Sequence, residues 1–293
     1  MAGKTAFILA GGASRGAYQA GCLKRLEEEG IVPDLVIGSS IGVCNSLVYL
    51  SGGSEALWSF WSRAISLPRV LTPSLRHNPL IGNSFFSMNS LAAMVEEEVD
   101  FDACYRSEVE LTFVVANLSV GREELRGNRT ETDVGRFRTV TRMGYSIPIL
   151  HPLVELDGDM YADGGFLWNV PFEYAEEWGA DHVYILSVIP SELPRADSLR
   201  FIPQVAQRMY DVFWRTFGNS SYLEKDLDEN GRYHGIEVTI LEPSPQTGMF
   251  DPVGMINAHP GKSKKLLLEG YRDTDHALRG REPRTGRIKG AQP

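Results

Sequence analysis

The sequence predicts an α/β fold with a mainly parallel central sheet that helices cover on both faces. Residues 6–10 form a short apolar run that stops at two glycines, and the helical spacing of residues 17–29 follows at once. A second apolar run, residues 35–37, ends at Gly38, and another helical pattern begins near Ile41. Short buried strands that alternate with helices across tight turns are typical of parallel sheets with both faces covered.

The remaining chain continues this alternation. Within the first helix, Tyr18, Cys22 and Leu26 share one stripe, and Gly30 is the residue type that commonly ends a helix. Apolar runs predict further strands at residues 110–117, 182–188 and 236–241. Helical spacing predicts further helices around residues 90–98, 172–178, 202–217 and 262–278. No internal repeat or linker divides these elements.

Composition and charge exclude several classes of protein. The 293 residues hold 29 Lys and Arg against 38 Asp and Glu, which gives a net charge of −9. This acidic balance argues against nucleic acid as the main partner and against adsorption to anionic membranes by charge alone. Three cysteines are too few and too scattered for a disulfide framework or a zinc site. No apolar run approaches the roughly 20 residues that span a bilayer.

The N-terminal segment predicts a strand rather than an export signal. Lys4 precedes the apolar residues 6–10, a stretch shorter than the core of about 7–15 residues that a signal peptide needs. The expected location is therefore the cytoplasm, with peripheral and transient contact to a membrane surface as an open alternative. Such contact would have to come from apolar residues around the cleft, because the net charge does not favour it.

Two stretches depart from the regular alternation. Residues 57–88 hold several aromatic side chains among prolines and serines: Trp58, Phe60, Trp61, Phe85 and Phe86. They are interpreted as an irregular cap with buried aromatics, and the alternative is a lid or an apolar acyl-binding surface. Residues 279–293 hold five basic residues and one acidic residue among glycines and prolines. We expect a disordered tail there, with a weak membrane-attracting patch as the second interpretation.

A Gly-x-Ser-x-Gly pattern follows the second predicted strand as Gly38-Ser39-Ser40-Ile41-Gly42. The pattern alone is weak, but its position between a buried strand and a helix is that of a nucleophile elbow. Side chains at both flanking positions would collide in so sharp a turn, which explains the two glycines. Ser40 would stand at a helix N-terminus, where developing negative charge is favoured. The alternative is an ordinary strand-to-helix turn with Ser39 as its N-cap.

A glycine-rich loop follows the first predicted strand as Gly11-Gly12-Ala13-Ser14-Arg15-Gly16. Its position is that of a dinucleotide-binding loop, but Ala13 breaks the Gly-x-Gly-x-x-Gly spacing. The acidic residue expected after the second strand is missing as well. Consecutive small residues suit an oxyanion hole better, since they leave backbone N–H groups free to converge on one point. Arg15 would either hold the loop in shape or meet a phosphate.

A serine nucleophile needs a base, and the sequence offers two kinds. None of the histidines sits in a distinctive motif: His77, His151, His182, His234, His259 and His276. Asp163-Gly164-Gly165 stands out instead, although Asp-Gly-Gly alone most often marks a hairpin turn. A free aspartate is a poor base toward a serine hydroxyl, so Asp163 would need an apolar cleft that raises its pKa.

Taken in this order, the three motifs resemble the patatin-like phospholipase family. Its pattern joins a Gly-Gly-Gly-x-Arg-Gly loop, a Gly-x-Ser-x-Gly elbow and a later Asp-Gly-Gly or Asp-Gly-Ala. Supporting matches are Ala17-Tyr18-Gln19-Ala20-Gly21, Pro33-Asp34, Ser146-Ile147-Pro148 with Pro152, Asn169-Val170-Pro171 and Phe250-Asp251. The resemblance covers residues 5–278 as one domain and implies a three-layer α/β/α sandwich. It also implies hydrolysis of acyl esters, commonly of glycerolipids, without a metal or an organic cofactor.

Carried over residue by residue, the resemblance makes Ser40 the nucleophile and Asp163 its base, a dyad without histidine. Backbone N–H groups around Gly12–Ser14, joined by that of Ile41, would form the oxyanion hole. Two residues depart from the family pattern. Ala13 replaces a glycine, which a small side chain tolerates where φ is negative. Ile41 replaces a frequent small residue and is expected to narrow the acyl specificity.

Three other functions stay open. A general carboxylesterase would use the same residues on other esters. An α/β-hydrolase with a Ser-Asp-His triad fits less well, because its nucleophile normally follows several strands rather than the second. A non-enzymatic nucleotide-binding module is disfavoured by Ala13 and by the missing acidic residue. The expected partner is a lipid or another acyl ester, and the sequence sets no oligomeric state.

Overall fold

A nine-stranded sheet organises the part of the chain that the computed structural model describes: residues 3–63, 72–73, 84, 86–87, 89–193, 195–196, 198–217, 226–244 and 260–280. The strand order is β10-β11-β9-β1-β2-β5-β8-β7, and β6 pairs with β5 beside this path. The parallel strands are β1 (Thr5–Leu9), β2 (Leu35–Gly38), β5 (Glu110–Asn117), β9 (His182–Leu186) and β11 (Ile236–Leu241). The antiparallel strands are β6 (Arg122–Gly127), β7 (Val154–Leu156), β8 (Asp159–Asp163) and β10 (Arg232–Tyr233). A separate ribbon pairs β3 (Thr72–Pro73) with β4 (Phe86–Ser87).

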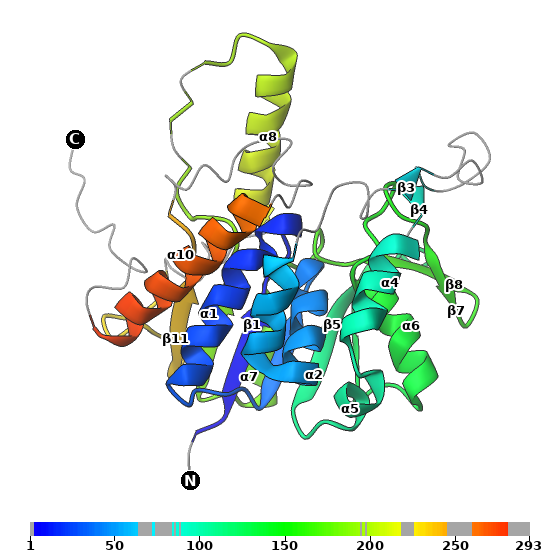
Figure 1. Cartoon of the computed structure of the whole chain (residues 1–293), viewed down its shortest axis with the longest axis horizontal. Coiled ribbons are helices and arrows are strands. Elements are labelled where there is room, and N and C mark those ends of the chain that lie inside the picture. The colour runs from blue at the N-terminus through cyan, green and yellow to red at the C-terminus, as the bar shows by residue number, and fades with distance from the viewer. Residues whose placement is uncertain are drawn as a thin grey trace.

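Strands β1, β2, β5 and β9 are buried on both faces after their first residues, as their mainly apolar sequences predict, whereas β11 keeps Glu237 exposed. In β1, Phe7 and Leu9 face one hydrophobic core, whereas Ala6 and Ile8 face a second core on the other side of the sheet. Helices close the first core: η1 (Ala13–Arg15) with α1 (Gly16–Glu28), α2 (Ile41–Ser62), α4 (Asn89–Glu98), α5 (Phe101–Arg106), α6 (Val134–Gly144) and α10 (Pro260–Leu278). α7 (Phe172–Trp178) covers the second core from behind the sheet (Figure 1). The predicted three-layer α/β/α arrangement is confirmed.

The C-terminal part of the described chain returns to the first helix. α10 crosses α1 so closely that a Cβ atom on Gly21 or Gly270 would overlap the backbone of the facing helix. Arg25 Nε donates to Asp275 Oδ1 at 2.9 Å across this contact. α1 therefore has a fixed position, and the glycine loop that precedes it is fixed with it.

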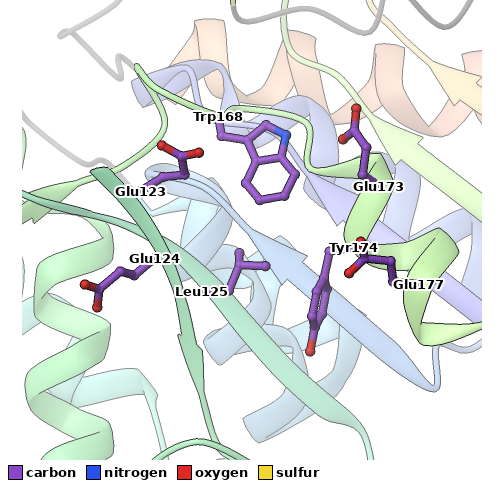
Figure 2. Close-up of a pocket in the computed structure, with 7 residues that line it drawn as sticks. All are labelled: Glu123, Glu124, Leu125, Trp168, Glu173, Tyr174 and Glu177. Atoms are coloured by element: carbon purple, nitrogen blue, oxygen red, sulfur yellow. The ribbon is translucent and has the colours of Figure 1, made fainter. Parts of the chain in front are cut away.

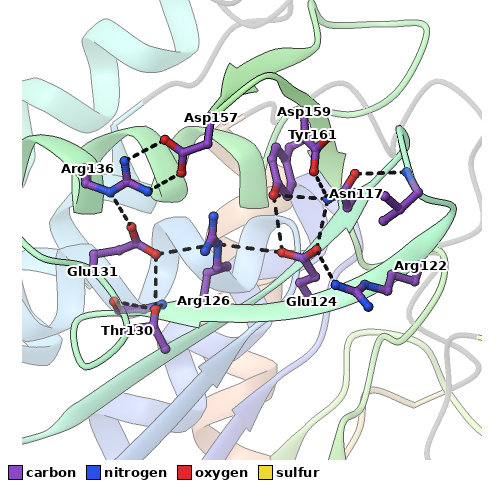
Figure 3. Close-up of polar contacts among 12 residues, drawn as sticks. Asn117, Arg122, Glu124, Arg126, Thr130, Glu131, Arg136, Asp157, Asp159 and Tyr161 are labelled. Atoms are coloured by element: carbon purple, nitrogen blue, oxygen red, sulfur yellow. Dashed lines mark hydrogen bonds and ion pairs between the residues drawn. The ribbon is translucent and has the colours of Figure 1, made fainter.

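A polar network beside β6 holds the antiparallel strands to β5 (Figure 3). Asn117, at the end of β5, donates to Asp159 Oδ2 at 2.9 Å and to Glu124 Oε1 at 3.0 Å. Arg136 of α6 makes a two-point ion pair with Asp157 in the β7–β8 turn, at 2.6 and 3.0 Å. These contacts fix the register of β8, whose last residue is Asp163.

Most predicted elements are confirmed to within two residues, and several were not predicted. Sequence patterns did not indicate α5, α6 or the antiparallel strands β6, β7 and β10. Residues 57–62 belong to α2 rather than to the irregular stretch expected from residue 57. Most of residues 63–88, with Phe85, and the tail beyond residue 280 lie outside the described residues. No described helix is long and apolar enough to cross a bilayer.

Candidate active site

β2 and β8 pair with the same side of β5, one after the other along its length. β6 pairs with the other side of β5 and overlaps both of them. Gly38, the last residue of β2, pairs with Phe113, and Asp163, the last residue of β8, pairs with Val115. The two strands run toward each other, so their ends are offset by two residues of β5, roughly 7 Å. This register brings the elbow and the Asp-Gly-Gly motif together.

Ser40 stands on a strained turn between β2 and α2. Its φ of 53° and ψ of −120° are rare for a residue with a side chain, and such strain is typical of a nucleophile elbow. A Cβ on Gly42 would overlap the Leu9 carbonyl, and one on Gly38 would lie 2.9 Å from the Gly42 backbone. The two glycines therefore allow β1, β2 and α2 to approach closely enough for this turn.

Asp163 is buried, with only 4% of its surface exposed. The Gly165 N–H donates to its Oδ1 at 2.8 Å, and its own N–H donates to the Ser146 carbonyl at 2.8 Å. Desolvation raises the pKa of Asp163 to about 6, against the lowering effect of hydrogen bonds from the Ser40 hydroxyl and the Gly165 N–H. The carboxyl thus faces Ser40 as a stronger base than an exposed aspartate.

The glycine loop lies directly against Ser40. A Cβ on Gly11 would lie 2.8 Å from Ser40 Cβ. The Gly11 N–H donates to Asn169 Oδ1 at 2.6 Å, and Asn169 Nδ2 donates to the Gly11 carbonyl at 3.4 Å. Buried Asn169, in the segment that follows Asp163, therefore binds both backbone polar groups of Gly11 and so fixes the two peptides that flank this residue.

The backbone at Ala13 corrects one expectation. Its φ is 54°, in the left-handed region, whereas alanine was expected to be tolerated here with a negative φ. The family pattern has glycine at this position, and glycine adopts such a φ without steric cost. Alanine carries a cost of roughly 1–2 kcal/mol there.

Ala13→Gly is therefore expected to leave the free energy of unfolding unchanged or to raise it by up to about 1 kcal/mol, although glycine loses more backbone entropy on folding. Exposed Ala93 in helix α4 provides a matched control, because Ala93→Gly should lose about 1 kcal/mol. Urea unfolding measures both variants. Equal losses in the two would show that Ala13 is not strained.

A buried polar network supports the loop from the other side. Gln19 Nε2 donates to the carbonyls of Ala10 and Leu186, at 2.7 and 2.8 Å. Asn45 Nδ2 donates to Gln19 Oε1 at 2.7 Å, and Trp61 Nε1 donates to Asn45 Oδ1 at 2.9 Å. The sequence motifs did not assign these roles. The sequence signal that could have found them is the presence of the polar residues Gln19 and Asn45 within otherwise apolar helical stripes, since buried polar groups are usually hydrogen-bonded.

No hydrogen bond joins Ser40 or Asp163 to a histidine among the described residues. Three described histidines bond elsewhere: His151 to Ile147, His182 to Thr239 and His234 to Glu176. His77 and His259 lie outside the described residues. The described geometry thus brings an aspartate, and not a histidine, to Ser40.

A pocket of about 330 Å³ lies between β6 and α7, separate from Ser40 (Figure 2). It is lined by Glu123, Glu124, Leu125, Trp168, Glu173, Tyr174 and Glu177. Its glutamates disfavour a phosphate or carboxylate ligand. No three His, Cys, Asp or Glu side chains in the described parts of the chain are grouped for a metal ion, these glutamates included.

The fold and the site define an α/β protein that presents a serine on a strand–helix elbow against a buried aspartate. The family model described as patatin-like phospholipase matches residues 7–176, which include the loop, the elbow and Asp163. The chain belongs to the patatin-like phospholipase family.

Relatives and solved structures are similar to this chain over most of its length. Patatin-like phospholipase domain-containing protein 6 of Mus musculus is 27% identical over 191 residues, covering 62% of this chain and 13% of that protein. Lysophospholipase NTE1 of Phaeosphaeria nodorum is 27% identical over 229 residues, covering 72% of this chain and 13% of that protein. This chain thus matches only a small part of these longer relatives. Among solved structures, VipD from Legionella pneumophila aligns with a TM-score of 0.44 and 14% identity, over 94% of this chain and 67% of that one.

Proposed function

We propose that the protein hydrolyses carboxylic esters of lipids with a Ser40–Asp163 dyad and a backbone oxyanion hole. The observation that carries this proposal is the strained Ser40 elbow facing a buried aspartate whose pKa is raised to about 6. An aspartate with this pKa is mainly ionised at pH 7. It also binds a proton roughly a hundredfold more tightly than an ordinary aspartate does.

In the proposed reaction, Ser40 Oγ attacks the ester carbonyl carbon while its proton moves to Asp163. Backbone N–H groups of Gly12, Ala13 and Ile41 hold the oxyanion, and the positive end of α2 adds to this stabilisation. Gly11 and Gly16 hold the ends of the loop, and Ser14 and Arg15 complete its turn. The alcohol leaves with the proton from Asp163. Asp163 then activates water, which cleaves the acyl-enzyme and releases the acid.

A lipid substrate is supported by membership of the patatin-like phospholipase family and by the similarity to a relative named as a lysophospholipase. Ile41 follows the nucleophile and packs toward Gly16, where it would limit the space for the acyl chain. A general carboxylesterase that accepts only soluble esters is the alternative, and substrate range separates the two.

The test compares wild type with Ser40→Ala on three substrates: a fluorophosphonate serine probe, a short p-nitrophenyl ester and a panel of phospholipids and lysophospholipids. We expect Ser40→Ala to lose both probe labelling and at least about 10³-fold in ester turnover. We expect wild type to release fatty acid from members of the lipid panel, detected by mass spectrometry. Hydrolysis of short esters alone would contradict the lipid assignment, and turnover by Ser40→Ala would contradict the nucleophile.

A further inference from the structure

Helix α8 (Ile202–Phe217) carries an exposed apolar stripe. Ile202, Val205, Met209, Val212 and Phe213 recur at helical spacing and occupy an arc of about 100° on one side of the helix. All five are exposed, Ile202 by 85% and Met209 by 68%. Single exposed apolar residues are ordinary on a protein surface, but an aligned group of five is not.

α8 stands at the edge of the sheet that is formed by the carboxyl ends of the parallel strands, where Ser40 also lies. It projects from the body of the protein there (Figure 1). Its Arg215 Nε donates to the Ser191 carbonyl at 2.6 Å, in the segment that follows the end of β9. The last residue of β9, Leu186, pairs with Leu9, just before the glycine loop. The helix is thus anchored close to the strand ends that form the candidate site.

Other exposed apolar side chains in the described structure gather at the same edge. Leu118 and Val120 lie in the turn beyond the end of β5. Ile149 lies in the loop before β7, and Leu167 lies in the loop after β8, whose last residue is Asp163. Val32 lies at the opposite edge, before β2 starts. The edge that holds Ser40 is therefore the more apolar one.

The charge around α8 differs from that of the whole protein. Residues 195–217 hold four arginines and two aspartates, a local balance of +2 in a chain of net charge −9. Arg208 and Arg215 lie on α8 along one side of the stripe, and an apolar stripe with basic residues beside it is typical of helices that lie in the interface of a lipid bilayer. The local cations suit lipid phosphates, and the stripe suits the acyl region below them.

We propose that the α8 stripe docks the protein on a phospholipid surface by inserting into the boundary between headgroups and acyl chains. The choice of lipid as the occupant rests on the proposed function. Docking through α8 turns the edge that carries Ser40 toward the membrane, where an ester substrate is concentrated. Insertion of apolar side chains provides most of the binding, and the local arginines add a smaller part by binding lipid phosphates, because the net charge of the whole chain is negative.

The test measures flotation of the whole chain with unilamellar phosphatidylcholine vesicles, with and without phosphatidylserine, at low and high salt. The α8 variant is the double substitution Ile202→Asp/Met209→Asp, which replaces two apolar residues of the stripe with charged ones. Val32→Asp/Leu268→Asp is the matched control, since it changes two exposed apolar residues outside α8. We expect vesicle partitioning of the α8 variant to fall by at least about tenfold, and that of the control to stay within about twofold of wild type. Salt should change wild-type binding little.

Turnover of a soluble p-nitrophenyl ester is expected to be unchanged in both variants, whereas hydrolysis of vesicle lipid should fall only in the α8 variant. Equal flotation of wild type and the α8 variant would overturn the proposal. The proposal would also be overturned if wild type did not bind vesicles but formed a dimer that dissociated in the α8 variant. The stripe would then join two copies of the chain. Wild type that floats with vesicles but cleaves no ester would contradict the proposed function and leave the docking surface standing.

Discussion

Asp163→Asn is expected to abolish ester hydrolysis and to make the folded protein more stable at neutral pH. The amide is nearly isosteric with the carboxyl, and its oxygen still accepts the hydrogen bond from the Gly165 N–H. It cannot take the proton from Ser40, so we expect turnover of a soluble ester to fall by at least about 10³-fold. A base with a pKa of about 6 also predicts that wild-type turnover declines as the pH falls below that value.

The gain in stability follows from the direction of the pKa shift. Desolvation raises the pKa of Asp163 from 3.8 to about 6 in the folded protein, so the folded state binds this proton more tightly than the unfolded chain. The resulting stabilisation is complete below pH 3.8 and is lost as the pH rises through about 6. At pH 7 the buried charge costs about 3 kcal/mol, which the neutral amide avoids.

Urea unfolding of wild type and Asp163→Asn at pH 7 and at pH near 4 measures this difference. We expect a gain of about 2–3 kcal/mol at pH 7 that shrinks toward zero in acid. Asp102→Asn, at an exposed position of α5, is the matched control and should keep both ester turnover and stability. Wild-type turnover by Asp163→Asn would rule out Asp163 as the base, and a loss of stability at pH 7 would contradict the raised pKa.

The elbow could be predicted from the sequence because its constraints are local. Gly38 and Gly42 are needed within five residues of chain, and the strand before them and the helix after them are visible in the apolar pattern. The helical spacing of residues 202–217 likewise predicted α8 with both of its ends. In these segments short-range sterics and periodicity are sufficient to set the structure.

Features that depend on partners distant in the sequence could not be predicted in this way. The meeting of Gly38 and Asp163 requires β8 to pair with β5 in one antiparallel register, which polar contacts such as Asn117 with Asp159 help to fix. The positive φ of Ala13 comes from the packing of the loop rather than from its own preference. The exposure of the α8 stripe depends on which segments pack beside the helix, and the sequence of the helix itself does not predict them.

Asn169→Ala is expected to lower kcat by about 10²-fold with little change in KM, because it frees the backbone of Gly11 beside Ser40. In the folded protein the Asn169 side chain, from the segment that follows Asp163, binds the N–H and the carbonyl of Gly11 and so holds the two peptides that flank it. A loop that must find its orientation in each turnover stabilises the oxyanion less than one that is already oriented. The free energy of unfolding should also fall by about 1–3 kcal/mol, since a buried N–H loses its acceptor.

Asn128→Ala separates this effect from a general loss of stability. Asn128 is also a buried asparagine that binds backbone: its Oδ1 accepts from the Leu111 N–H at 2.9 Å, and its Nδ2 donates to the Val109 carbonyl at 3.0 Å. It follows the last residue of β6 and lies beside the start of β5, at the end of the sheet opposite Ser40. We expect the two variants to lose similar stability in urea, while only Asn169→Ala loses kcat and reacts more slowly with a fluorophosphonate. If turnover falls equally in both variants, Asn169 acts through stability alone. If turnover falls in neither, the orientation of the Gly11 backbone does not limit the reaction.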